Sequence, residues 1–276
     1  MIIDFHTHVF PDSIADATLK ALSTSGSVTP CIGGTVSALL SSMDAAGVNK
    51  SVILPVNTRK GQFDSITRFA EHINDTYDEL ISFGGIHPDD DDIEEKLSYL
   101  KNRGFKGVKI HPDYTRTYIN DERYIRIIAE CHRQGLLVIT HAGYDPSYTD
   151  VHCPPQMALD MLNKVNSISP YEEPFIIIAH LGGNRLLSDV ERYLVGQNCY
   201  LDISCSFSDL GEFSDSSDED IVRVIKNHGA DRVLFATDSP WNDPKAYIDR
   251  VRSLKGLTDN EKELILGKNA ERLLKL

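Results

Sequence analysis

The chain has 276 residues, of which 41% are hydrophobic and 25% are charged, as in an ordinary globular protein. Its formal net charge of −13 disfavours nucleic acid or an anionic membrane as the main partner. We find no signal-peptide pattern, no apolar run approaching about 20 residues and no CxxC pair. We therefore expect a cytoplasmic protein with reduced thiols, folded as one domain over residues 1–276.

Short apolar runs alternate along the chain with amphipathic segments, a pattern typical of strands joined by crossover helices. The apolar runs predict strands at Ile2–Val9, Ser51–Pro55, Ile81–His87, Gly107–His111, Leu136–His141, Phe175–His180, Tyr200–Ser204 and Arg232–Asp238. The amphipathic segments predict helices at Ser13–Ser23, Thr35–Ala46, Asp64–Glu79, Ile93–Arg103, Glu122–Gln134, Pro155–Val165, Arg185–Val195, Glu219–His228, Pro244–Leu254 and Asn260–Leu276.

Eight strands with crossover helices predict an α/β fold, a (β/α)8 TIM barrel with short extra helices at its N- and C-terminal ends. The strands are short and apolar, as strands covered on both faces must be. A doubly wound open sheet is the alternative. It is disfavoured because no GxGxxG sequence follows a strand and no GxxxxGK[ST] sequence occurs.

An acidic, serine-rich segment, Ser206–Asp220, follows the seventh predicted strand. It could form a lid over a site at the strand ends. We favour a solvated loop in which Ser217 or Asp218 caps the next helix, because runs of charge usually lie in water.

Polar side chains gather where the predicted strands end. His6 and His8 are two residues apart, so they project to the same side of the first strand and can share one metal ion. Later strand ends carry His87, Lys109, His111, His141, His180 and Asp238. The active site of a barrel lies at these ends, so the side chains should converge. Neutral imidazoles with a carboxylate suit Zn²⁺, and also Mn²⁺ or Fe²⁺.

This pattern of strand-end histidines and Asp238 resembles the amidohydrolase superfamily. The segments Phe105–Pro112, Ala179–Gly183, Phe235–Pro240 and Gly267–Leu274 are similar to the branch that includes aminocarboxymuconate-semialdehyde decarboxylase and related hydrolases. The resemblance covers nearly the whole chain.

The resemblance implies that His6, His8, His141 and Asp238 bind the metal, for which zinc is the first expectation. It implies that His180 acts as a general acid or base, and that Asp238 also accepts the proton of the metal-bound water. Lys109 should face inward, because its neighbours on the strand face the helices. It is either a carboxylated bridge between two metals or, as we favour, an unmodified lysine near Asp238 or a substrate carboxylate.

These residues predict a metal-dependent hydrolase that acts on an amide, lactone or ester through an activated water. The same residues suit the alternative, non-oxidative decarboxylation of an unsaturated or aromatic acid. A non-catalytic barrel that retains a structural metal is the third interpretation.

The expected partner is a small-molecule substrate that bears a carboxylate. Arg59 and Arg116, in loops after the second and fourth strands, could clamp such a group in two-point fashion. The remaining predicted substrate contacts are His111, Tyr144 and Trp241. Association into a homo-oligomer stays open.

Overall fold

The computed structural model describes residues 1–207 and 216–276. All strand pairs in this part of the chain are parallel. The strands are β1 (Ile3–Thr7), β2 (Lys50–Ile53), β3 (Leu80–Ser82), β4 (Gly84–Gly85), β5 (Gly107–Ile110), β6 (Leu137–Thr140), β7 (Ile176–Ile178), β8 (Tyr200–Asp202) and β9 (Val233–Leu234).

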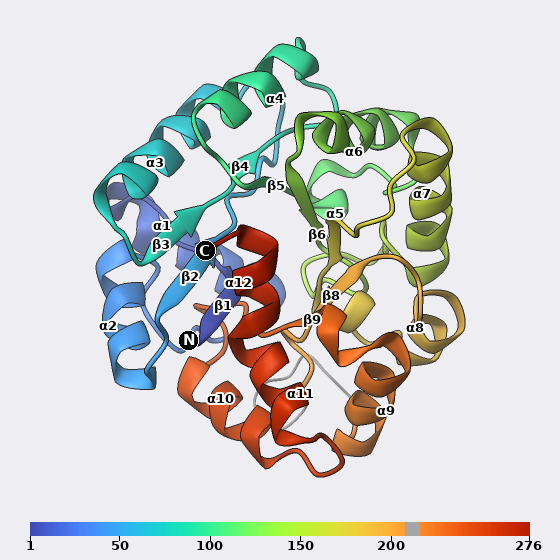
Figure 1. Ribbon diagram of the computed structural model, residues 1–276. Helices are drawn as coiled ribbons and strands as arrows, with labels where there is room; N and C mark the ends of the chain where they lie inside the picture. Colours follow the sequence, from blue (N-terminus) through green and yellow to red (C-terminus); the bar gives the residue numbers. More distant parts are fainter. Residues whose placement is uncertain (208–215) are drawn as a thin grey trace.

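Helices connect most of the strands, and most of the helices form an outer ring around them (Figure 1). They are α1 (Asp12–Gly26), α2 (Val36–Ala46), α3 (Phe63–Thr76), α4 (Ile93–Asn102), α5 (Pro112–Thr115), α6 (Glu122–Gln134), α7 (Pro155–Ile168), α8 (Leu187–Tyr193), α9 (Asp218–His228), α10 (Pro244–Ser253), α11 (Asp259–Glu263) and α12 (Asn269–Leu274). No described helix has both the length and the apolarity needed to cross a membrane.

Strand pairing divides into two sheets, β1-β2-β3 and β4 through β9, and further hydrogen bonds link them. Only Phe83 separates β3 from β4, and its N–H donates to Ile53 O at 2.9 Å. The N–H of Phe5 on β1 donates to Phe235 O, also at 2.9 Å, so the first strand meets the segment after the last. The α/β fold thus has the predicted barrel order, although the strand ladder is not continuous.

Several strands end earlier than the apolar runs predicted. The structure ends β7 at Ile178 and β9 at Leu234, before His180 and Asp238. These two residues have φ of 58° and 60°, which lies outside the extended range that a ladder requires.

The predicted C-terminal helix, Asn260–Leu276, is interrupted. A π-helical turn, Leu264–Lys268, separates α11 from α12. There the carbonyl oxygen of Ile265 accepts a hydrogen bond from Phe235 N–H at 2.9 Å. A Cβ at Gly267 would lie 2.0 Å from Met1 O, so this turn packs closely against the start of the chain. Periodicity along the helix does not reveal such a tertiary contact.

Ser217 caps α9, as the solvated-loop interpretation of Ser206–Asp220 predicted. Its hydroxyl accepts from Asp220 N–H, and the Asp220 carboxylate accepts from Ser217 N–H in return. The possible lid that includes Asp209, Glu212 and Asp215 lies outside the described residues.

Two apolar clusters stabilise the fold. The larger fills the space between strands and helices. The smaller, inner cluster draws side chains from most of the strands and includes Ala270 and Leu274 of α12. Figure 1 shows α12 lying across the middle of the strand ring, and it contacts β1 and β9. The last helix therefore covers the end of the barrel opposite the polar strand ends.

We expect Leu274→Ala to lower the free energy of unfolding by about 2–5 kcal/mol, because it opens a cavity in the inner cluster. Urea titration followed by circular dichroism measures this. Leu276→Ala is the control, since Leu276 is 52% exposed, and it should change stability by less than about 0.5 kcal/mol. Equal losses in both variants would contradict a closing role for α12.

Candidate functional site

Polar side chains at the carboxyl ends of the strands come from separate parts of the chain. His6 lies on β1 and His8 follows it, whereas His180 follows β7 and Asp238 follows β9. Cys205, after β8, has the same left-handed backbone as His180 and Asp238, with φ of 55°. Such conformations are costly outside glycine and persist where the surrounding structure holds them. Three consecutive strand ends are therefore strained beside the site.

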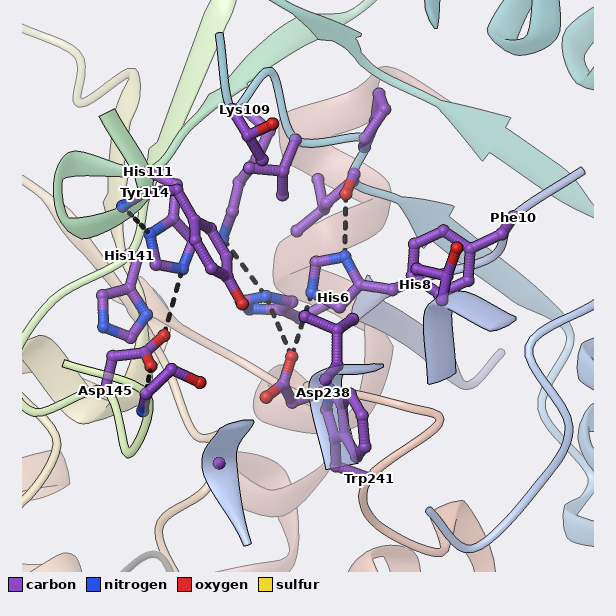
Figure 2. Close-up of a pocket in the computed structure, with 18 of the residues that line it drawn as sticks. His6, His8, Phe10, Lys109, His111, Tyr114, His141, Asp145, Asp238 and Trp241 are labelled. Atoms are coloured by element: carbon purple, nitrogen blue, oxygen red, sulfur yellow. Dashed lines mark hydrogen bonds and ion pairs between the residues drawn. The ribbon is translucent and has the colours of Figure 1, made fainter. Parts of the chain in front are cut away.

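Asp238 is the point on which the first-strand histidines converge. Its Oδ1 lies 3.0 Å from Nε2 of His8 and 3.3 Å from Nε2 of His6. Nζ of Lys109 lies 3.2 Å from the same His6 nitrogen. Figure 2 shows these side chains directed at a common space. The structure thus brings together three of the four predicted metal ligands.

The Nδ1 atoms of His6 and His8 determine where each ring carries its proton. Nδ1 of His8 lies 2.8 Å from Leu54 O, which can only accept, so Nδ1 must donate. Nδ1 of His6 lies 2.9 Å from Oδ2 of Asp202. Burial raises the pKa of Asp202, but the His6 charge and hydrogen bond outweigh it and leave the pKa below its ordinary value. When the two rings are neutral, this arrangement leaves the lone pair of each on Nε2, which faces Asp238.

This donor set fits a divalent cation. Two imidazole lone pairs and a carboxylate oxygen repel one another unless a positive charge or a proton lies among them. Burial raises the pKa of Asp238, but His6 and His8 together hold it well below its usual range, so the carboxylate is ionised. The three donor atoms lie within 4.8 Å of one another. Imidazole nitrogens oriented by outer hydrogen bonds, together with a carboxylate, suit Zn²⁺, Mn²⁺ or Fe²⁺.

His180 lies next to this group and is held on both ring nitrogens. Its Nδ1 is 2.9 Å from Ser204 Oγ, and its Nε2 is 2.9 Å from Nδ1 of His141. Burial lowers the pKa of His180 to about 4, so the ring is neutral at pH 7. The acid–base role of His180 stays a prediction.

His141, the fourth predicted ligand, lies in the same cavity but in a different group. It stacks on His111 with ring centroids 4.2 Å apart, and its Nε2 lies 3.6 Å from Oδ2 of Asp113. Neither of those two atoms has a hydrogen-bond partner among the described residues. His111 lies 3.6 Å from Asp145, which completes a second group of donor atoms. Metal binding by His141 stays a prediction.

One cavity of about 470 Å³ is lined by both groups of donor atoms, His6, His8 and Asp238 in one and His111, His141 and Asp145 in the other. We call the part formed by His6, His8, Lys109, His180 and Asp238 the cavity floor. Among the described residues, Lys109 is the only lysine or arginine that lines the cavity. Burial lowers the pKa of Lys109 to about 8, so the ammonium form still dominates at pH 7. The floor therefore offers one fixed positive side chain.

The predicted substrate contacts divide into two sets. His111, Tyr144 and Trp241 line the cavity, as do all the predicted catalytic and metal-binding residues. Arg59 and Arg116 do not: both are exposed and lie outside the cavity wall. Both arginines belong to surface turns, and the expected guanidinium clamp stays a prediction.

Sequence reasoning missed the residues that hold the histidines in place. Asp202 accepts from His6, and its other oxygen accepts from the backbone N–H of His180 and of Ser204, each at 3.0 Å. Cys205 Sγ lies 3.3 Å from Oδ2 of Asp238. The alternation of Asp202 and Ser204 along a strand that ends at the site was the available signal.

Comparisons with known proteins agree with this architecture. A family model described as amidohydrolase matches residues 3–276. The search of curated protein sequences found no match.

Several solved structures have a similar fold. A 2,6-dihydroxybenzoate decarboxylase from Rhizobium has 16% identity and a TM-score of 0.67, covering 99% of this chain and 98% of its own. A 5-carboxyvanillate decarboxylase from Sphingomonas paucimobilis has 14% identity and a TM-score of 0.68, covering 100% and 99%. A dihydroxybenzoic acid decarboxylase from Polaromonas, with bound manganese and 2-nitroresorcinol, has 15% identity and a TM-score of 0.66, covering 100% and 97%.

At these identities the solved structures establish the fold, and the family model establishes the family. Its match covers nearly the whole chain and includes every predicted metal ligand. The chain belongs to the amidohydrolase family.

Proposed function

We propose that this protein is a divalent-metal-dependent decarboxylase of a small aromatic carboxylic acid. The observation that carries the proposal is one cavity that combines a metal-binding floor and a single cationic side chain with apolar and aromatic walls. A carboxylate can pair with Lys109, and a flat ring can lie against side chains such as Phe10 and Trp241. The similar solved decarboxylases of aromatic acids support the same reaction class.

The reaction needs a site that withdraws charge and supplies a proton. A divalent ion held by His6, His8 and Asp238 would orient the substrate and stabilise the negative charge that develops as CO₂ departs. The carbon–carbon bond to the carboxylate breaks, its electron pair stays on the ring carbon, and a proton takes the place of CO₂.

The chain's own residues can hold that proton. Ligand atoms of His180 and Asp238 lie within 4.8 Å of each other, and both side chains line the floor. Burial lowers the pKa of His180 to about 4, so a proton that reaches its ring is held weakly and passes on readily. Ser204 and His141 fix the orientation of its ring. We therefore assign His180 as the acid–base residue, with Asp238 beside it.

Hydrolysis of an amide, lactone or ester is the function that the sequence alone favours, and the same floor would serve it. The aromatic walls and the similar decarboxylases favour decarboxylation. Membership of the amidohydrolase family speaks against a barrel with a purely structural metal.

The direct test follows CO₂ and product together. Protein supplied with Mn²⁺ or Zn²⁺ is incubated with hydroxybenzoates, including 2,6-dihydroxybenzoate and 5-carboxyvanillate, and separately with lactones and N-acyl amino acids. We expect one CO₂ for each decarboxylated phenol formed. Hydrolysis of the second group without CO₂ release from the first would reject the decarboxylase proposal.

Metal content should depend on His8. His8→Ala removes one of the three donor atoms that His6, His8 and Asp238 supply. We therefore expect bound metal to fall to near zero while the far-ultraviolet circular dichroism spectrum is unchanged. Elemental analysis of purified protein measures the metal. His72→Ala is the matched control, because His72 is exposed on α3. If both variants keep one metal per chain, the proposed ligand set is incorrect.

His180→Asn should separate catalysis from metal binding. We expect kcat to fall by roughly 10²–10⁴-fold, the usual contribution of a general acid or base, while metal content stays unchanged. Steady-state kinetics and elemental analysis on the same preparation give both values. Loss of metal as complete as in His8→Ala would make His180 a ligand instead.

A further inference from the structure

The cavity extends beyond its floor between α1 and α3. We call this extension the apolar arm; it is lined by Phe10, Ile14, Leu22, Val28, Ile66 and Phe69. Figure 2 shows Phe10 and Asp145 on opposite sides of His6 and Asp238, so the arm begins on the His8 side of the floor. Floor and arm belong to one continuous cavity, which a single ligand can occupy.

Helix α1 forms one wall of the arm, since Ile14 and Leu22 of this helix line the cavity. Its C-terminal part is fixed to the loop after β6, where Ser25 Oγ lies 3.0 Å from Ser147 Oγ. Gly26 packs beside Pro146, since a Cβ there would lie 3.3 Å from the proline Cγ. The α1 wall of the arm is therefore fixed in position by contacts between its C-terminal end and the loop after β6.

The side chains of the arm are apolar, yet they are not fully buried. Leu22, Val28 and Ile66 keep part of their surface exposed, and Ile14 is 49% exposed. Partly exposed apolar side chains that gather on a concave surface mark ligand-binding sites more often than they mark solvent-facing walls. An apolar ligand group placed there would remove their remaining surface from water.

Within the part of the chain that the structure describes, the arm offers no partner for a charged group. The charged residues that line the cavity are Lys109, Asp145 and Asp238, and all three follow or belong to strand ends. The polar residues of α1 and of the start of α3 that line the cavity are the neutral Thr18, Gln62 and Ser65. A charged substituent would lose its hydration there without compensation. The chemistry of the arm thus selects uncharged, apolar groups.

We propose that the apolar arm binds an alkyl or aryl substituent of the substrate, while the carboxylated ring lies at the cavity floor. This inference rests on the proposed function for the position of the carboxylate. The cavity volume of about 470 Å³ falls in the range of pockets that hold ligands much larger than a single ring. The substrate class is therefore aromatic acids that carry an extended apolar substituent.

The test measures affinity by isothermal titration calorimetry with two homologous series. One series is benzoate with 4-n-alkyl groups from methyl to butyl, and the other is the corresponding 4-n-alkylbenzyl alcohols, which lack the charge. Protein supplied with Mn²⁺ is used throughout. We expect each added methylene to tighten binding about three- to fourfold in both series, as transfer of a methylene from water predicts.

Substitutions in the arm give the matched comparison. Leu22→Asp and Ile14→Asp should collapse the affinity ratio of 4-butylbenzoate to benzoate toward one. Ile168→Asp is the control: Ile168 ends α7, is 52% exposed and does not line the cavity, so the ratio should be kept. Circular dichroism on each variant verifies folding. Because two arm variants are used, the test can still be read if one of them does not fold.

The outcomes separate the two proposals. Affinity that is independent of chain length in both series overturns the apolar arm, even where benzoates bind and release CO₂. Equal gains per methylene in both series, with no advantage for the acids, support the arm and reject the carboxylate substrate of the proposed function. An unchanged ratio in both folded arm variants would also overturn the arm.

Discussion

The buried carboxylate of Asp202 is the interaction on which the site depends. One oxygen accepts from His6 on β1, and the other accepts from the backbone N–H of His180 after β7 and of Ser204 after β8. A fully buried carboxylate is tolerated only with such a set of partners. Asp202 therefore ties three strand ends together and fixes the tautomer of His6, which turns the Nε2 lone pair toward Asp238.

The inner apolar core and the candidate site lie at opposite ends of the same strand ring. The inner apolar cluster and α12 cover one end, while the cavity opens at the other. Side chains alternate along each strand, so positions that face the interior either fill the core or reach the cavity according to their depth. On β5, Lys109 faces the interior and reaches the cavity. Its neighbours Val108 and Ile110 pack in the larger apolar cluster, between strands and helices.

The sequence predicted the barrel order and most strand-end polar residues, because apolar runs and their polar ends are local patterns. Local patterns could not show that Arg59 and Arg116 lie outside the cavity wall, because the positions of these side chains are determined by turns at the surface. They also could not show that His141 stacks on His111, since this requires the distance between two neighbouring strands. The π-helical turn before α12 escaped prediction for a similar reason: it packs against Met1, which is distant in the sequence.

The left-handed backbone at Asp238 restricts how the sequence can change during evolution. Asparagine and glycine adopt this conformation readily, whereas β-branched and bulky residues resist it. A lineage that loses the charge at this position keeps the strand end intact most easily through asparagine. Relatives with asparagine there would be folded proteins with an impaired metal site, and so natural candidates for barrels that have exchanged catalysis for binding.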